Sequence, residues 1–399
     1  MKVGKDQDKH LTYCTNIHPG ESWEEVLIQL KANLPELKSR LSPDKSFGVG
    51  LRLSEEAAGD LLEGDRLESF KEWLEEENLY VFTMNGFPYG SFHGERVKDN
   101  VYKPDWTDRK RLEYTINLAE ILAELLPEDI DGGISTSPLS YKPWLEEVEY
   151  EEVFRISSRH LAEVAFKLAQ IEQQQGKELH IDIEPEPDCL IENTQETVDF
   201  FQHWLFKAGA AQLAVDHSFS QEEAVNLLKR HIRVCYDTCH FAVEYEDPKE
   251  AIEQFRDAGI KIGKVQISAA LKVAFDDNYD RVSSKLKQFE EDTYLHQVIE
   301  RNSEDSLKHY PDLGEALFAD INTEVNEWRI HFHVPIFVDQ FDMLSSTQDD
   351  IVHSLELFRD DECSHFEIET YTWDVLPPEL KENIRDSIER EYRWTLEQF

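Results

Sequence analysis

Short strand-like segments alternate with long amphipathic helical patterns along the whole chain, and this alternation limits the possible folds more than any other feature. Strand patterns cover 10–16, 47–54, 79–86, 132–138, 178–186, 232–239, 262–268, 329–337 and 365–372. Helical patterns cover 22–41, 64–77, 107–127, 151–175, 194–208, 221–230, 247–258, 279–301, 347–359 and 379–398. Ser22 is the expected N-cap of the first helix, which carries acids in its first turn. Strand followed by helix, repeated, predicts parallel strands with helical crossovers.

The side chains of these strands divide into two faces. Ile181 and Ile183 share one face of their strand, while His180, Asp182 and Glu184 share the other. The other strands show the same division into an apolar and a small or polar face. A doubly wound sheet would be apolar on both faces. The pattern therefore favours a (β/α)₈ TIM barrel, with apolar side chains toward the helices and polar ones inside. Solvent-facing antiparallel strands are the alternative, and the helices between the strands disfavour it.

Nine strand patterns are one too many for a barrel of eight. We expect one TIM-barrel domain over 1–399, with the acidic segment 270–328 as a helical insertion at the catalytic mouth. The pattern at 329–337 would then be a lip strand returning from the insertion. It could instead be a barrel strand, with 47–54 displaced. The sequence leaves both possibilities open.

Composition excludes several classes of function. Hydrophobic residues make up 40% of 399 residues, and the formal net charge is −42. Such a charge repels nucleic acid and anionic membrane surfaces. No run approaches the roughly 18 apolar residues of a membrane span, and the N-terminal residues lack a signal-peptide core. The five cysteines are odd in number and widely spaced, as in a reducing compartment. We therefore expect a cytoplasmic protein that is not an integral membrane protein, with a small-molecule partner.

Candidate site residues follow from barrel geometry, because active sites of such barrels lie at the carboxyl ends of the strands. Polar residues that end the strands on the inward face, or follow closely, are Asn16, His18, Arg52, Asn85, His93, Ser135, Ser137, Glu184, Glu186, Asp237, His240, Gln266, His333 and Glu369. We expect His18, Arg52, Asn85, His93 and His333 to bind substrate.

Carboxylates at one mouth cannot all stay ionised without compensation. A divalent cation held by Glu184, Asp237, Gln266 and Glu369 would supply it. These oxygen donors suit Mn²⁺ or Mg²⁺. If His240 or His333 replaced one donor, Zn²⁺ or Co²⁺ would fit as well.

The strings "IDIEPE", "YDTCH", "KVQIS" and "EIET" resemble the xylose-isomerase-like superfamily of sugar-phosphate isomerases and epimerases. More narrowly, "LTYCTNIHPGESW", "FTMNGFPYGSFHG", "GGISTSPLSYKPW" and "HFHVPIF" resemble the EboE family of metabolite traffic proteins. The superfamily resemblance implies a metal held by Glu, Asp, His or a similar residue, and Glu from successive strands. Gln266 departs from that pattern, because many superfamily members have His or Asp there.

The resemblance implies proton abstraction next to a carbonyl of a small polar hydroxy-carbonyl metabolite. Glu184 and Glu369 would be the catalytic base and acid, and His240 would stabilise a developing oxyanion. The EboE resemblance implies instead a non-catalytic barrel that hands a metabolite to other proteins of an Ebo-type pathway. A metal-dependent phosphodiesterase acting on damaged DNA would share the fold, and the net charge disfavours it.

Overall fold

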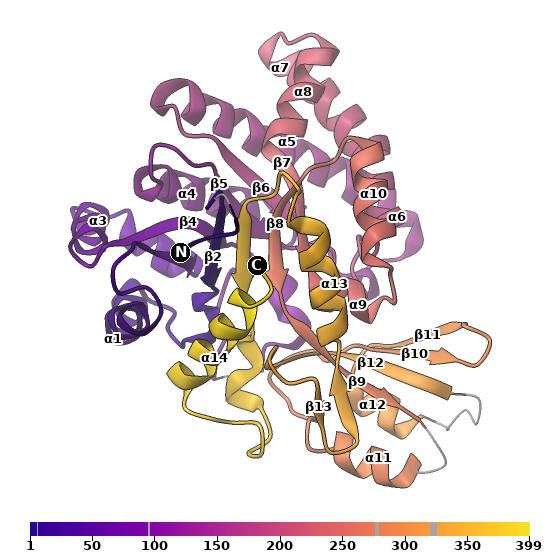
Figure 1. The fold of residues 1–399 in the computed structure, drawn as a ribbon. Helices are drawn as coiled ribbons and strands as arrows, with labels where there is room; N and C mark the ends of the chain where they lie inside the picture. The colour runs from indigo at the N-terminus through magenta and orange to yellow at the C-terminus, as the bar shows by residue number, and fades with distance from the viewer. Residues whose placement is uncertain (6, 95, 276–278, 320–324) are drawn as a thin grey trace.

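The protein is described by a computed structural model over residues 1–5, 7–94, 96–275, 279–319 and 325–399. Eight parallel strands form its central sheet (Figure 1). In chain order they are β2 (Lys9–Tyr13), β3 (Phe47–Arg52), β4 (Leu79–Asn85), β5 (Gly132–Thr136), β6 (Leu179–Ile183), β7 (Ile232–Asp237), β8 (Ile262–Ile267) and β15 (His365–Ile368). Each pairs in parallel with its neighbour from β3 through β8, and β15 joins β8 to β2.

The sheet closes into a barrel between β2 and β3, where Cys14 and Gly50 form a parallel bridge. Glycine is required at that seam, because a Cβ on Gly50 would lie 2.4 Å from Glu367 Oε1. Strand β1 (Lys2–Val3) adds to β2 antiparallel, outside the barrel. The segment 47–54 is therefore a barrel strand, and the alternative that displaced it is wrong.

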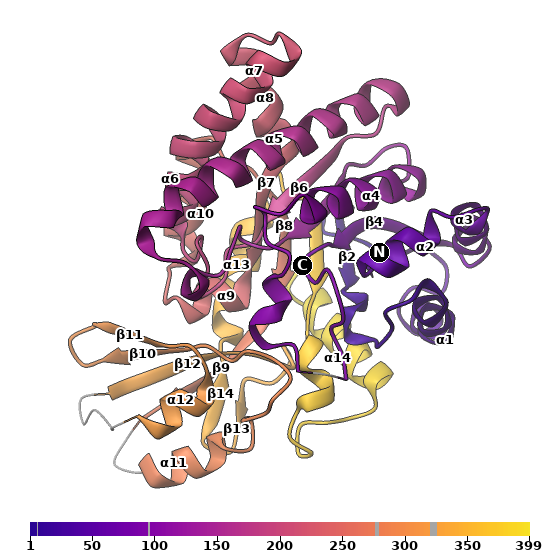
Figure 2. The ribbon, with the colours of Figure 1, turned by 180° about the vertical axis from the view of Figure 1, so that it is seen from behind.

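Helices cover the outside of the barrel (Figures 1 and 2). The α-helices around it are α1 (Trp23–Leu41), α2 (Glu55–Leu61), α3 (Arg66–Glu76), α4 (Arg109–Leu125), α5 (Tyr150–Gln175), α6 (Thr194–Phe200), α7 (Ala210–His217), α8 (Gln221–His231), α9 (Thr238–Val243), α10 (Pro248–Ala258), α13 (Gln348–Phe358) and α14 (Ile384–Leu396). A π-helix, η5 (Phe201–Gly209), joins α6 to α7, and short 3₁₀ turns are η1 (Thr15–Ile17), η2 (Lys98–Tyr102), η3 (Lys142–Trp144), η4 (Glu147–Glu149) and η6 (Tyr371–Val375). Ser22 caps α1 in a capping box with Glu25, as expected. None of the described helices is both long and apolar enough to cross a bilayer.

The segment between β8 and α13 differs from its prediction. It folds mainly as a six-stranded antiparallel sheet in the order β11-β10-β12-β9-β14-β13, below the barrel in Figure 1. Its elements are β9 (Ala269–Ala274), α11 (Tyr279–Leu286), β10 (Val298–Asn302), β11 (Leu307–Tyr310), α12 (Leu313–Phe318), β12 (Val325–Val334), β13 (Gln340–Phe341) and β14 (Leu344–Ser346). The expectation of a helical insertion over 270–328 was thus wrong in secondary structure; residues 276–278 and 320–324 lie outside the described ranges.

The error has a physical reason. Strands β10 and β11 are only five and four residues long and carry charged side chains, so they lack a clear two-residue alternation. Strand β11 lies at the edge of the sheet, and edge strands often carry such charges, which prevent pairing with other chains. The long strand β12, which includes most of 329–337, belongs to this sheet and not to the barrel.

Polar side chains fill the barrel interior, as the two-face pattern predicted. Lys264 of β8 and Glu367 of β15 form an ion pair there, and both side chains are fully buried. Nearer the amino ends of the strands, His180 Nδ1 lies 2.6 Å from Asp182 Oδ1. Gly263 makes room for this pair, since a Cβ there would lie 2.0 Å from the same Asp182 oxygen.

Candidate functional site: a carboxylate cluster at the barrel mouth

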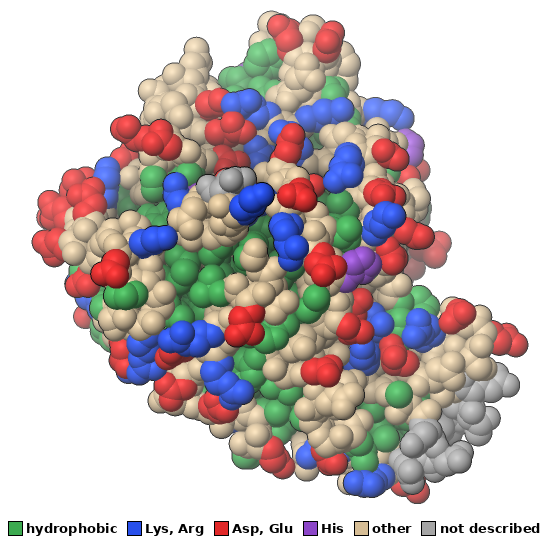
Figure 3. All heavy atoms as spheres, viewed as in Figure 1, with side chains coloured by type: hydrophobic (Ala, Val, Ile, Leu, Met, Phe, Trp, Pro, Cys, Tyr) green, Lys and Arg blue, Asp and Glu red, His purple; other side chains and the backbone are tan. Residues whose placement is uncertain are grey.

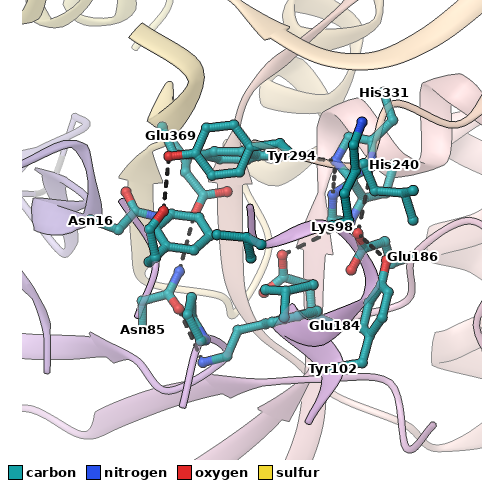
Figure 4. A pocket seen from close by; sticks show the side chains of 17 residues that line it. Asn16, Asn85, Lys98, Tyr102, Glu184, Glu186, His240, Tyr294, His331 and Glu369 are labelled. Carbon is teal, nitrogen blue, oxygen red and sulfur yellow. Dashed lines mark hydrogen bonds and ion pairs between the residues drawn. The ribbon is translucent and has the colours of Figure 1, made fainter. Parts of the chain in front are cut away.

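A cavity of about 500 Å³, counted out to its opening, lies at the carboxyl ends of the barrel strands (Figure 4). Its walls combine barrel loops with the insertion. The ionisable groups that reach it include Lys98, Glu184, Glu186, His240, His331 and Glu369. In Figure 4, Asn16 and Asn85 lie beside Glu369 on one side, and Glu186, Tyr102 and the two histidines lie on the other. Strand ends and insertion therefore build one polar pocket.

Three carboxylates from three different strands meet at the floor of this cavity. Their common partner is Gln266 Nε2 on β8. It lies 2.6 Å from Glu369 Oε2, 3.2 Å from Glu184 Oε1 and 3.3 Å from Asp237 Oδ2. All four side chains predicted as metal ligands are thus in one cluster. Gln266 and Asp237 are completely buried, while Glu184 and Glu369 also line the cavity.

Two amides hold Glu369 in place. Asn16 Nδ2 donates to its Oε1 at 2.8 Å, and Asn85 Nδ2 donates to the same atom at 2.9 Å. Asn16 lies in η1, just after β2, and Asn85 ends β4, so the carboxylate is oriented by two separate parts of the barrel. Of the residues predicted to bind substrate, Asn85 is the one that lines this cavity.

Asp237 has two roles in the structure. Its Oδ1 caps α9 by accepting from the backbone N–H groups of Cys239 at 2.8 Å and His240 at 3.1 Å, and from Ser268 Oγ at 2.6 Å. Its Oδ2 points instead toward Gln266. One oxygen therefore fixes the side chain and the other remains available to the cluster.

The cluster is electrostatically costly. Burial, followed by the charges of Glu369 and Asp237, raises the pKa of Glu184 well above its ordinary value. Burial, followed by Asp237, raises the pKa of Glu369 to about 8. Burial likewise raises the pKa of Glu186 to about 8. Lys264 opposes the first two shifts from the layer below. A positive ion at the centre of the cluster would stabilise the ionised form of these carboxylates.

The residues present fit a divalent ion by the chemistry of their donors. Glu184 Oε2 is buried and has no hydrogen-bond partner within the described residues. Three carboxylates with an amide form the kind of oxygen set that hard divalent ions prefer. Gln266 now presents its nitrogen to the carboxylates while its Oε1 accepts from Cys235 Sγ at 3.0 Å. Reversal of the amide would turn that oxygen toward the three carboxylates.

Three of the residues predicted to bind substrate do not line this cavity. His18 is buried against Tyr13, whose hydroxyl lies 2.9 Å from its Nε2. Arg52 donates to the carbonyl oxygens of Gly20 and Gly90 and pairs with Glu21 at 3.0 Å. His93 packs its ring against Phe92. None of the three lines the cavity. Inward position alone did not reveal that Tyr13 would engage His18 or that loop carbonyls would engage Arg52. Both ring nitrogens of His93 are buried without a hydrogen-bond partner among the described residues.

The two remaining predicted histidines lie close to the cluster. His240 lines the cavity, and His333 lies behind it with Nδ1 3.0 Å from the Glu369 backbone oxygen. His240 Nδ1 lies 2.9 Å from the Pro185 oxygen, which can only accept, so a neutral His240 presents a bare Nε2 to the cavity. Burial lowers the pKa of His240 and disfavours the protonated form. The predicted role as an oxyanion donor is therefore not supported.

Several cavity residues had been given no role by the sequence analysis. Glu186 lies two residues after Glu184 and therefore on the same face of the extended chain. This spacing was the sequence signal that could have assigned it to the cavity. Its Oε1 accepts from the hydroxyl of Tyr102 at 2.9 Å. Tyr102 and Lys98 come from the long connection after β4, and no periodic pattern marks them. His331 lies on the same face of its strand as His333. It reaches the cavity only because this strand belongs to the antiparallel sheet, which the sequence did not predict.

Both signs of charge occur on the face drawn in Figure 3. Acidic side chains are scattered across the face drawn in Figure 3, with Lys and Arg between them. The cavity is recognised by its buried groups instead.

Comparison with known proteins supports the fold. No family model matches the chain, and no curated protein sequence matches it. A solved IOLI protein with bound zinc aligns at a TM-score of 0.50 and 12% identity, covering 98% of this chain and 97% of its own. A xylose-isomerase-like TIM-barrel protein from Mycobacterium smegmatis, solved with magnesium, aligns at 0.51 and 9% identity, covering 98% and 96%. At these identities the likeness establishes the fold, a xylose-isomerase-like TIM barrel.

Proposed function

We propose that this xylose-isomerase-like barrel is a divalent-metal-dependent enzyme of the isomerase and epimerase type. Its substrate would be a small polar hydroxy-carbonyl metabolite. The observation that carries the proposal is the convergence of Glu184, Asp237 and Glu369 on one point, each within 3.3 Å of Gln266 Nε2. This point lies at the carboxyl ends of the strands, where barrel enzymes have their active sites.

A divalent ion held by these residues would polarise a substrate carbonyl and lower the cost of removing a proton beside it. Glu184 is best suited to move that proton. Its Oε2 is buried and unpartnered among the described residues, and burial raises its pKa, so this atom can both accept and hold a proton. Glu369 has both oxygens engaged by amides and acts better as a fixed ligand.

Glu186 is the second candidate for proton transfer. It faces the same cavity, and its pKa of about 8 leaves it protonated near neutral pH. Tyr102 orients it through one hydrogen bond. Epimerisation requires a base and an acid on opposite faces of one carbon, and isomerisation requires proton transfer between neighbouring carbons.

Deuterium exchange tests the proposal without knowledge of the natural substrate. The chain is loaded with Mn²⁺ and incubated in D₂O with a panel of ketoses, aldoses and hydroxy-ketones, and proton NMR follows the carbon next to each carbonyl. We expect exchange with at least one compound, abolished in Glu184→Gln. Glu253→Gln, which alters an exposed glutamate of α10, is the matched control and should retain the exchange. If a compound of the panel binds to the chain but no compound of the panel exchanges its proton for deuterium, the enzymatic proposal is contradicted.

A non-catalytic metabolite carrier is the second candidate, and one observation favours it. The Gln266 amide contacts all three carboxylates and accepts from Cys235, so part of the hydrogen bonding of the cluster is met without an ion. A carrier would bind its metabolite equally well with and without divalent metal. Exchange that requires metal would exclude this candidate.

A role beside other proteins of an Ebo-type pathway in the cytoplasm stays a prediction from the sequence resemblance. It would be tested by isolating the chain with the other products of such a pathway. The enzymatic proposal does not depend on it.

A further inference from the structure

A cluster of two histidines and two aspartates lies at the amino ends of the barrel strands, opposite the mouth. Asp131 directly precedes β5, His180 and Asp182 lie on β6, and His365 is the first residue of β15. Ligand atoms of Asp131, His180 and His365 all lie within 4.8 Å of one another. The side chains of the two histidines and of Asp182 are at most 1% exposed. Four polar groups are thus enclosed together at this end of the barrel.

This cluster is separate from the carboxylates of the mouth. Along the chain, Glu367 lies between His365 and Glu369, and its side chain is held in a fully buried ion pair with Lys264. That pair occupies the barrel interior between the two ends. A ligand at the amino end would therefore use none of the donors at the mouth, and an inference about it does not rest on the proposed function.

Asp182 orients the ring of His180. Asp182 Oδ1 lies 2.6 Å from His180 Nδ1 and accepts a hydrogen bond from it. The other ring nitrogen, Nε2, lies 3.4 Å from Asp131 Oδ2 but has no hydrogen-bond partner among the described residues. A carboxylate at one ring nitrogen is a common way to orient a histidine whose other nitrogen binds a metal.

His365 has no hydrogen-bond partner for either ring nitrogen in the described part of the chain. Its Nε2 lies 3.3 Å from Asp131 Oδ1. A ring N–H directed at a carboxylate oxygen over this distance would form a hydrogen bond, so the ring is not directed at that oxygen. A buried nitrogen without a partner is unfavourable, and a bound ion would remove the cost.

The distances within the cluster match those between ligands of one metal ion. Ligand atoms around a tetrahedral ion are roughly 3.3 Å apart, given metal–ligand distances of about 2.0–2.1 Å. Such atoms point at the ion and not at one another. Asp131 lies 3.3 Å and 3.4 Å from the two Nε2 atoms without accepting a hydrogen bond from either. Close atoms that are not directed at one another fit an ion between them.

Two glycines on other strands keep space for the cluster. A Cβ on Gly133 of β5 would lie 2.6 Å from both Asp182 Oδ2 and His180 Cε1, and 3.0 Å from His365 Nδ1. A Cβ on Gly263 of β8 would lie 2.6 Å from His180 Nδ1. Any larger residue at these positions would displace the two histidines.

Asp131 connects the cluster to the surface. Its side chain is 29% exposed and lines a cleft at the amino ends of the strands, together with Glu178 and Arg233. Arg233 donates to Asp131 Oδ2 at 3.0 Å and to Glu178 Oε1 at 2.7 Å, which fixes the Asp131 carboxylate from outside. Asp131 Oδ1 faces His365 instead. The cleft gives an ion a route to the buried rings.

We propose that Asp131, His180 and His365 bind one transition-metal ion of the Zn²⁺ type at the amino end of the barrel. Two imidazoles and one carboxylate favour later first-row ions such as Zn²⁺ over Mn²⁺ or Mg²⁺. The ion would tie β15 to β5 and β6, which are not its neighbours in the sheet. Its role would be structural, because the amino end of such barrels serves stability and the carboxyl end serves catalysis.

Zinc titrations test the inference in a chain whose mouth acids are removed, since these acids could also bind Zn²⁺. The full chain with Glu184→Gln and Glu369→Gln is freed of metal and titrated with Zn²⁺ against a chromophoric chelator. We expect tight Zn²⁺ binding that depends on Asp131. Adding Asp131→Asn should weaken it at least as much as loss of an orienting partner does, roughly 10–100-fold. The matched control adds Asp129→Asn, at an exposed aspartate two residues away, and should leave the affinity unchanged. Equal Zn²⁺ affinity in the two chains would overturn the inference.

Thermal melting gives a second measurement. An ion that binds only the folded chain stabilises it, so Zn²⁺ should raise the melting temperature less in Asp131→Asn than in Asp129→Asn. Mn²⁺ binding at the mouth should be the same in these two variants. Loss of Mn²⁺ binding in the wild type would count against the proposed function while leaving the amino-end site standing.

Crystallography keeps the test decisive if Asp131→Asn folds poorly. Crystals of the wild-type chain loaded with Zn²⁺ should show an anomalous difference peak bonded to His180 Nε2 and His365 Nε2, with Asp131 as the third ligand. A map in which both of these nitrogens lack a bound ion would overturn the inference.

Discussion

The buried ion pair between Lys264 and Glu367 gives the sharpest prediction about stability. Both side chains are fully buried inside the barrel, one layer below the carboxylate cluster. Replacement of Lys264 by Met removes the positive partner and leaves the Glu367 carboxylate in an interior that cannot hydrate it.

The expected cost follows from the burial. Breaking a fully buried pair by removing one partner costs about 3–5 kcal/mol. For 399 residues, that corresponds to a fall in melting temperature of roughly 5 °C. Adding Glu367→Gln to Lys264→Met should recover most of the loss, because both charges are then absent. Gln is the size-matched choice, since Gly50 packs closely against Glu367.

The assay is a double-mutant cycle by urea denaturation and thermal melting of the metal-free chain. Lys264 also lowers the pKa values of Glu184 and Glu369. Its loss should therefore raise both values further. A cost below about 1 kcal/mol for Lys264→Met, or no recovery in the double variant, would refute the reasoning.

Three further predictions concern the site and its surroundings. The pKa of Glu186 is about 8 in the folded chain and 4.5 ordinarily. Between these two pH values, Glu186 is therefore protonated in the folded chain but ionised in the unfolded chain. Stability of the metal-free chain should therefore fall as pH rises from about 5 to 8, and Glu186→Gln should lessen this fall in melting scans, with the other carboxyls of raised pKa accounting for the rest. Asn16→Leu or Asn85→Leu removes one donor to Glu369 and should weaken Mn²⁺ binding roughly 10-fold in titrations followed by electron paramagnetic resonance; unchanged affinity would contradict the assigned role. Arg52→Met should lower the melting temperature yet leave metal and ligand affinity unchanged, and a selective loss of ligand binding would restore Arg52 as a substrate contact.

The sequence was sufficient for the barrel because its signal is repeated in every strand. Alternation such as Ile181 and Ile183 against Asp182 and Glu184 reports the two environments of a barrel strand directly. Strand ends then locate the mouth, which is why Glu184, Asp237, Gln266 and Glu369 could be named together. Their mutual distances depend on the closed barrel and were not available from the sequence.

The features that the sequence did not reveal depend on contacts between residues far apart in the chain. Short charged strands such as β10 and β11 have too few residues to show a period, so the insertion was read as helical. Arg52 lies on the inward face at the end of its strand, as a residue of the barrel mouth would. Its guanidinium group instead donates hydrogen bonds to the loop carbonyl oxygens of Gly20 and Gly90. His331 gains its meaning from His240, 91 residues earlier, and only the fold brings them together.

The most direct test of the account is the number of Mn²⁺ ions bound by the chelator-stripped chain, measured by titration and elemental analysis. The account predicts one Mn²⁺ per chain in the wild type, and its loss when Glu184→Gln is combined with Glu369→Gln. A wild-type chain that takes up no Mn²⁺, or a double variant that binds it unchanged, would contradict the claim that these acids surround a single ion.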